Sequence, residues 1–402
     1  MKKGSSFVRL MGFEGRKNFL TPWILLLTVA LLLANGWRLS SEYQQKIRYF
    51  SEYEAVYEDF YQRWKGPITT ETGQELMTIF SPLEEKAQTM SLNRSEGSGI
   101  YTKSEGMDYD FFLRLFREEM EYDYLYGNRA IGIAQDAGKL ASYFRGLGLT
   151  ERAAESEAYA GTFSHRSVPN FADTRYIEVW LKHDYSSLLV LLLSLFGLCG
   201  VFVTEWETEM YMLQRVSRFG GGTNAAAKLT ASLLYVCGLC LLFYGEDFLV
   251  LQALSGHSEA LKSPLYAVWW MEDTPLNMTM GAYVLWSMAV KTLGMLSCGC
   301  LILLASCLCR RVLTAFVTSL GSLMVLIVVQ EGAQGRMSLK WFNPMELVLM
   351  RENVTDTGFV SIFGCPVQRY VVILLGILLV TAAMAGGILL RHPGRRERRR
   401  RA

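Results

Sequence analysis

The histidines and serines of this chain lie in none of the patterns that mark an active site. Its four histidines are far apart, none belongs to an HExxH zinc motif, and no GxSxG nucleophile motif occurs. Catalytic side chains must meet in a fixed geometry, which such motifs help to provide. We therefore predict no catalytic residues in this chain and no enzyme activity of its own.

The cysteines include two closely spaced pairs, Cys237/Cys240 and Cys307/Cys309, that resemble metal or redox motifs. No histidine or carboxylate stands beside either pair to complete a site. Seven of the eight cysteines fall in apolar runs, where a thiol behaves as a small, polarizable packing group. We predict no metal site and no cofactor bound by this chain.

A glycine-rich segment, 220–228, faintly resembles a phosphate-binding loop. It has no glycine directly before Lys228 and no serine or threonine after it, and it follows an expected helix rather than a strand. Any ATP that serves this protein must therefore be hydrolysed by another chain.

Charged residues are ordered along the segment that leads into Lys228. Acidic side chains come first and basic ones follow, which suits the dipole of a short helix over 205–218. The candidate residues for contact with a partner are Glu205, Glu207, Leu213, Arg215, Arg218 and Lys228. The alternative is a solvated connector whose charges only cap the helix.

Six apolar runs in the chain are long enough to span a membrane, and the charged segment 205–218 lies between two of them. A bilayer core needs about 20 apolar residues of helix, and a soluble domain rarely has so many such segments. The runs lie at 20–36, 185–204, 229–253, 282–309, 312–330 and 370–390. We predict an all-α polytopic membrane protein with six transmembrane helices.

Basic residues gather at alternate ends of these runs. They occur near the N-terminus, between 215 and 228, at 310–311, and in a tail with seven arginines. The positive-inside rule then places both termini in the cytoplasm and the long segment between the first two spans outside. A cleaved signal peptide is the alternative for the first run, but its long basic start and flanking tryptophans favour a span.

The inserted segment reads as a helical domain. Aromatic residues recur every three or four positions over 41–64, and further helices are expected at 71–90, 108–126 and 130–144, with an interruption at Ser81-Pro82. The domain has no cysteine, so helix packing must stabilise it. The expected organisation is a connecting helix at 1–19, a span at 20–38, the extracellular domain at 39–184, five spans within 185–390 and a basic tail at 391–402.

Three charged residues fall inside apolar runs. Counting 1.5 Å per residue from the cytoplasmic ends of their spans places Glu246, Asp247 and Lys291 at a similar depth near the outer edge. Because consecutive spans are usually neighbours, an interfacial ion pair is possible. The alternative is that each side chain reaches water separately.

The segment from Phe202 to Lys228 resembles that of ABC transporter permeases of the type-two exporter membrane-domain family. The matching positions are Phe202, Glu205, Leu213, Ser217-Arg218 and Ala227-Lys228. One departure is Glu209-Met210, which stands where the family usually has a glycine. The amphipathic segment at 5–19 resembles the connecting helix of that family, and the large domain between spans one and two resembles that of its Gram-positive members.

The resemblance implies a permease subunit of an ATP-driven exporter in a bacterial plasma membrane. It implies a separate cytoplasmic ABC ATPase, which would hold the ATP and Mg, and a second permease subunit, identical or not. The lipid bilayer is the other partner, and no nucleic acid is expected. The alternative function is a non-transporting sensor or envelope scaffold whose extracellular domain binds a partner.

Overall fold

The computed structural model describes residues 2–47, 52–94, 103–210, 221–332, 341–350, 358–362 and 364–391. These residues are mostly helical, and six helical segments among them are long and apolar enough to cross a membrane, as predicted. They are α2 (Pro22–Ile47), the segment α8–α9–α10 (Arg175–Glu207), α12 (Gly222–Ser255), α13 (Met280–Leu308), α14 (Val312–Gly332) and α17 (Arg369–Arg391).

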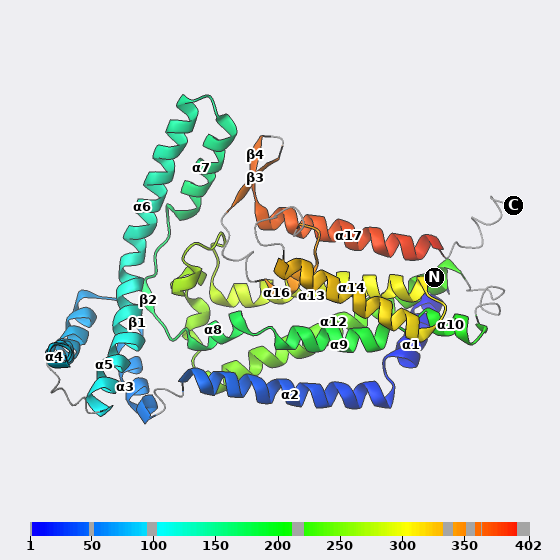
Figure 1. Cartoon of the computed structure of the whole chain (residues 1–402), viewed down its shortest axis with the longest axis horizontal. Helices are drawn as coiled ribbons and strands as arrows, with labels where there is room; N and C mark the ends of the chain where they lie inside the picture. Colours follow the sequence, from blue (N-terminus) through cyan, green and yellow to red (C-terminus); the bar gives the residue numbers. More distant parts are fainter. Residues whose placement is uncertain are drawn as a thin grey trace.

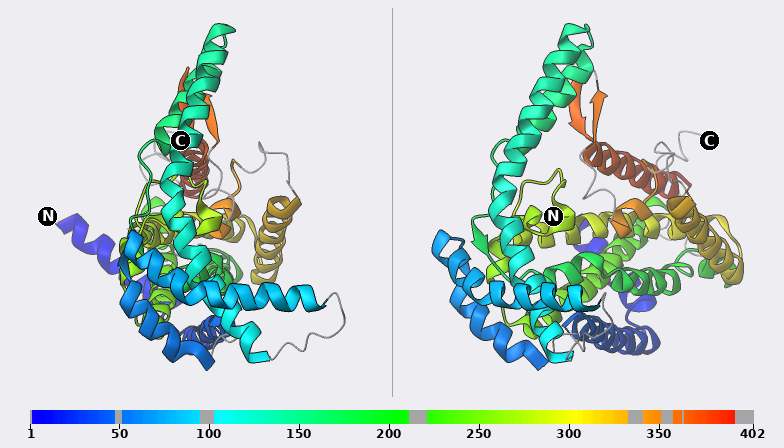
Figure 2. Two further views of the ribbon diagram at one scale, coloured as in Figure 1. Left: turned by 90° about the vertical axis from the view of Figure 1, so that its left-hand side faces the viewer. Right: turned by 60° about the vertical axis from the view of Figure 1, so that its left-hand side comes forward.

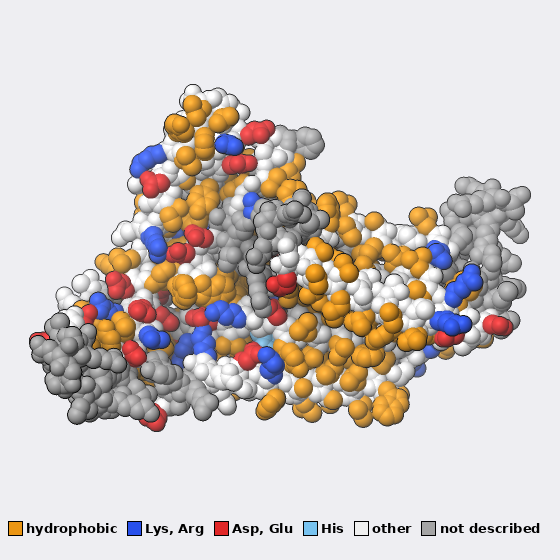
Figure 3. Space-filling view, viewed as in Figure 1, with side chains coloured by type: hydrophobic (Ala, Val, Ile, Leu, Met, Phe, Trp, Pro, Cys, Tyr) orange, Lys and Arg blue, Asp and Glu red, His pale blue; other side chains and the backbone are white. Residues whose placement is uncertain are grey.

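The six segments run side by side in one bundle (Figure 1). Helix α1 (Lys2–Asn18) and the last turn of α17 lie at one end, here named the terminal end. The described residues between α2 and α8 lie mostly at the other end, and we name them the insert domain and that end the insert end. Figure 3 shows apolar side chains over the middle of the bundle and charged ones toward its two ends. This distribution suits a helix bundle surrounded by lipid.

The second apolar segment is broken rather than continuous. It consists of α8 (Arg175–Lys182), α9 (Tyr185–Leu198) and α10 (Val203–Glu207), whereas the sequence predicts one run over 185–204. At the break before α10, the backbone N–H groups of Phe202 and Val203 donate to Ser306 Oγ at 3.1 and 3.3 Å. A side chain of α13 thus satisfies backbone donors that an unbroken helix would pair internally.

The insert domain contains α3 (Glu54–Trp64), α4 (Thr70–Arg94), α5 (Lys103–Phe112), the π-helical turn η2 (Leu113–Arg117), α6 (Glu118–Gly146) and α7 (Thr150–Phe163). The predicted aromatic stripe is buried: Tyr57, Tyr61 and Trp64 of α3 pack in one cluster with phenylalanines of α5 and η2. Strands β1 (Gly66–Pro67) and β2 (Asn170–Phe171) form a short antiparallel pair that joins the start of the domain to its end.

Two predicted helix interruptions in the insert domain are wrong. Helix α4 continues through Pro82, which faces solvent, so that the carbonyl group it leaves unpaired can bond to water. The helices predicted at 108–126 and 130–144 form one continuous helical stretch, in which α5 and η2 contain residues 108–117 and α6 runs on through Gly127. A Cβ at Gly127 would lie 3.7 Å from the carbonyl oxygen of Arg166, an ordinary contact distance, so alanine would also fit at this position.

Helices α6 and α7 form a hairpin that crosses the direction of the spans and extends beyond the bundle (Figures 1 and 2). Strands β3 (Phe359–Ile362) and β4 (Cys365–Gln368) pair antiparallel just before α17 and lie against α7. The short helices η3 (Glu259–Lys262), η4 (Leu265–Ala267) and η5 (Trp269–Met271) lie in the return between α12 and α13. Neither strand pair was expected from the sequence.

A short helix, α16 (Met345–Leu349), is inserted between two spans. A Cβ on Gly294 of α13 would lie 2.9 Å from Val348 Cγ2, and one on Gly376 of α17 would lie 2.9 Å from the carbonyl oxygen of Trp341. The amide group of Asn343 also donates to the carbonyl oxygen of Leu326 in α14 at 2.9 Å. The segment 341–349 is therefore packed among α13, α14 and α17.

Candidate functional site

Two of the predicted partner-contact residues meet in a buried ion pair at the terminal end. Glu205 of α10 pairs with the ammonium group of Lys228 of α12, and Lys17 of α1 lies 3.7 Å from the same Glu205 Oε1. Lys228 is 1% exposed and Glu205 is 6% exposed, so water does not screen this pair. We call these three residues the terminal junction.

Lys228 is held by more than its carboxylate partner. Its Nζ donates to the carbonyl oxygen of Val201 at 2.9 Å and lies 5.3 Å from the centre of the Phe202 ring. The break between α9 and α10 exposes this carbonyl group. The lysine therefore satisfies a backbone acceptor and stabilises the bend at once.

Helix α1 is fixed to the same place by its own contacts. Glu14 is buried and accepts a hydrogen bond from Asn18 Nδ2 at 3.1 Å. Phe19, which follows α1, stacks on Tyr235 of α12 with ring centres 4.4 Å apart. Helices α1, α10 and α12 thus meet around Glu205, although they are distant in the sequence.

The predicted helix over 205–218 is interrupted. Helix α10 ends at Glu207, and Glu209 has a φ of 58°, the left-handed conformation that ends helices. Glu205 turns inward to Lys228, whereas Glu207 is exposed. Leu213, Arg215 and Arg218 lie outside the described residues.

A second group of polar residues lies inside the bundle near the insert end. Asn35 Nδ2 of α2 donates to Asp247 Oδ1 at 2.6 Å and to Glu246 Oε2 at 3.2 Å, both on α12. His183, just before α9, lies 2.7 Å from Glu42 Oε2 through Nδ1 and 3.4 Å from Asn35 Oδ1 through Nε2. Three spans are therefore linked by polar side chains at this level.

The predicted pairing of Lys291 with Glu246 and Asp247 stays a prediction. Lys291 of α13 lies 3.8 Å from Asp184 Oδ1, at the start of the second span, while the two acids of α12 contact Asn35. The depth calculation placed the charges at a common level but could not give the direction in which each helix face points. Asn35 and His183 were missed, although a polar residue in or beside an apolar run indicates such a site.

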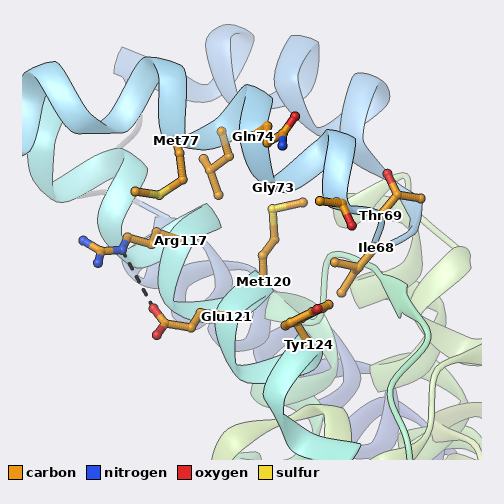
Figure 4. A pocket seen from close by; sticks show the side chains of 11 residues that line it. Ile68, Thr69, Gly73, Gln74, Met77, Arg117, Met120, Glu121 and Tyr124 are labelled. Carbon is orange, nitrogen blue, oxygen red and sulfur yellow. Dashed lines mark ion pairs between the residues drawn. The ribbon is translucent and has the colours of Figure 1, made fainter.

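The insert domain has an apolar cavity of about 470 Å³ between α4 and α6 (Figure 4). Met77 and Met120 face each other across it, and Tyr124 lies toward one side. The charged edge is Arg117, whose Nη1 lies 3.0 Å from Glu84 Oε1 and whose Nε lies 3.8 Å from Glu121 Oε2. The cavity can accommodate an apolar group. Arg117 at its edge is already paired with two carboxylates of the chain.

No three His, Cys, Asp or Glu side chains in the described part of the chain are grouped to hold a metal ion. The eight cysteines are free thiols, and only Cys365 is exposed.

No known family model matches this chain, and no curated protein is significantly similar to it in sequence.

Proposed function

We propose that this chain is the membrane-spanning permease subunit of an ATP-driven ABC exporter. In this proposal both termini are cytoplasmic, the insert domain is extracellular, and a separate ATPase supplies ATP hydrolysis with its own Mg. The terminal junction is the observation that carries the proposal. It connects an amphipathic helix, a broken span and the start of the third span next to the segment 211–220.

The junction suits transmission of force better than direct contact with a partner. Glu205 and Lys228 are buried, so a partner would touch exposed residues such as Glu207 and the segment that follows. Because α1, α10 and α12 share the buried pair, a push on that segment acts on all three helices. Closure of the ATPases on ATP would thereby change the packing of spans two and three and open the path to the other side.

The exposed faces of three spans support assembly with a second permease. Only 17%, 17% and 22% of the apolar stretches of α2, α14 and α17 are buried within the chain. Leu33, Val325 and Leu379 are among their exposed residues. In the proposed dimer one of these faces meets the second subunit and the others meet lipid.

Charge reversal at exposed Glu207 tests the proposal. The chain is co-expressed with a candidate stand-alone ABC ATPase from the same genome, and co-purification and ATP hydrolysis are measured. We expect Glu207→Lys to weaken both, because it alters the surface next to the junction without touching the buried pair. Glu151→Lys, an exposed reversal in α7 at the insert end, is the matched control. Equal co-purification of the two variants would count against a coupling role for this surface.

The apolar cavity between α4 and α6 favours a second function, that of a membrane-anchored sensor. An insert domain that binds a ligand with an apolar group would explain an open cavity of this size. The two functions differ in one observable property. A sensor would need no ATPase, so stable association with an ATP-hydrolysing partner supports the exporter.

A further inference from the structure

A second cavity, of about 220 Å³, lies where the insert domain meets the spans. Its walls come from α6, from α8 and from the return that contains η4 and η5. Four carboxylates line it, Glu118, Glu119, Asp123 and Glu178, together with the aromatic side chain of Trp269. We call it the acidic cavity.

Asp123 is the unusual member of this group. It is only 7% exposed, and its carboxylate has no hydrogen bond or ion pair with any residue that the structure describes. Buried acids in proteins are normally paired, because an isolated buried charge is strongly unfavourable. Its carboxylate is therefore stabilised by a proton, by water in the cavity or by a cation from outside the chain.

The pKa values of two carboxyl groups in the cavity also favour a bound cation. Burial raises the pKa of the Asp123 carboxyl well above its ordinary value. Burial, and then repulsion from neighbouring carboxylates such as Glu178, raises the pKa of Glu119 as well. A cation placed among these groups would relieve both effects.

Among the described residues, the cations near the cavity pair with other carboxylates or lie at its rim, and none pairs with Asp123. Lys46 of α2 pairs with Glu178, Arg129 of α6 pairs with Glu272 at 2.9 Å, and Arg175 of α8 pairs with Asp173 at 2.8 Å. Arg114 of η2 also lines the cavity but is exposed at its rim. The charged and titratable groups around Asp123 are thus Arg114, Glu118, Glu119, Tyr122, Arg129, Asp173, Arg175, Glu178, Lys46 and Glu272.

We propose that the acidic cavity binds a protonated primary amine. An alkylammonium group has three N–H donors, which match several carboxylates, and Trp269 offers an aromatic face to the cation. The cavity is large enough for an aminoalkyl chain. The described residues show no grouping of three ligands suited to a metal ion, which favours an organic cation. This inference goes beyond the proposed function, because it requires no ATPase partner.

Proton and amine compete for the same carboxylates, which gives the site a pH dependence. A primary amine keeps its proton up to about pH 10. The carboxyls with raised pKa lose their protons as the pH increases, and only the ionised forms attract the ammonium group. Affinity for the amine should therefore rise with pH.

The test uses the purified full-length protein in detergent, with butylammonium as the probe and calorimetric titration as the measurement. We expect Asp123→Asn to lower the affinity by about tenfold or more, because a charge-assisted hydrogen bond is lost. Glu119→Gln should act in the same direction, and it keeps the test valid if one variant folds poorly. Asp136→Asn is the control, since Asp136 is an exposed acid of the same helix that pairs with Lys139.

A second titration uses Nα-acetyl-lysine amide, whose side-chain ammonium group is free, and distinguishes the source of the amine. Similar affinities for both probes would indicate a free amine, and a clear preference for the lysine derivative would indicate a peptide side chain. Unchanged butylammonium affinity in both acidic-cavity variants would overturn the proposal. So would Ca²⁺ binding that excludes the amine, or an affinity that falls as the pH rises.

Discussion

Substitution of Lys228 by methionine tests how much the terminal junction contributes to the stability of the folded chain. The measurement does not depend on any contact with a partner. Methionine keeps most of the length of the side chain but removes the charge that faces Glu205. The carboxylate of Glu205 then stays buried, and Lys17 lies 3.7 Å away on a side chain that is 41% exposed. The carbonyl oxygen of Val201 also loses its donor.

The expected loss of stability follows from these contacts. Removal of one partner of a buried ion pair costs about 3–5 kcal/mol, because the other charge stays buried and uncompensated. Lys17 remains and can move closer, which favours the lower end of that range. We expect about 3 kcal/mol for Lys228→Met, including about 1 kcal/mol for the unsatisfied carbonyl group.

The measurement is thermal or denaturant unfolding of the purified protein in detergent at neutral pH. The double variant Glu205→Gln/Lys228→Met removes both charges and should recover at least half of the loss. Lys139→Met is the matched control, because Lys139 belongs to an exposed pair that contributes at most about 1 kcal/mol. The reasoning fails if Lys228→Met resembles the control, or if the double variant is less stable than the single one.

Two further predictions concern topology and pH. A membrane-impermeant thiol reagent should label wild-type protein in intact cells through Cys365, the one exposed cysteine, and Cys365→Ser should abolish the labelling; labelling that needs cell lysis would reverse the proposed orientation. Burial alone would raise the pKa of Asp173, but the charge and hydrogen bonds of Arg175 outweigh it and lower that pKa below its ordinary value of 3.8. The unfolded chain then takes up this proton more readily, so the contribution of Asp173 is present above about pH 4 and is lost as the pH falls through the lowered pKa. Asp173→Asn should remove this part of the acid sensitivity in unfolding measurements, and an unchanged acid profile would contradict it.

The spans were predictable because long apolar runs have few alternatives. The runs at 282–309, 312–330 and 370–390 correspond within two residues to α13, α14 and α17. Hydrophobicity alone defines these helices, since lipid requires every backbone group to be paired within the helix. The other three runs were less accurate. Helix α2 ends at Ile47, well beyond 36, and α12 begins at Gly222, before 229. The second span is broken where Ser306 of α13, about 100 positions later, accepts a hydrogen bond from the backbone N–H of Phe202.

The insert domain was predicted as helical, but the two helix interruptions predicted within it were wrong. Pro82 and Gly127 favour breaks by local preference, but the helices continue through both. Pro82 faces solvent, where water can bond to the carbonyl group that it leaves unpaired. Strands β3 and β4 were missed because four-residue segments beside a long apolar run give too weak an alternation.

The residues of the candidate sites were also predictable, but their partners were not. Glu205 and Lys228 were identified as members of one segment, but their direct pairing results from the bend at the end of α9. Asp247 and Lys291 were placed at one depth, yet the choice of partner depends on how each helix is rotated. Sequence spacing gives depth along a helix reliably, whereas the facing direction comes from packing against the other spans.

Helix α12 links the two polar regions of the bundle. Lys228 and Asp247 are 19 residues apart on this one helix, which corresponds to about 28 Å along its axis. The return that follows α12 is in turn clamped to the insert domain by Arg166, which donates to Asn277 Oδ1 at 2.7 Å and to the carbonyl oxygen of Thr274 at 2.6 Å. A rigid helix with both ends held by buried polar contacts moves as a unit. We therefore expect a displacement at the terminal junction to be carried along α12 toward Asp247.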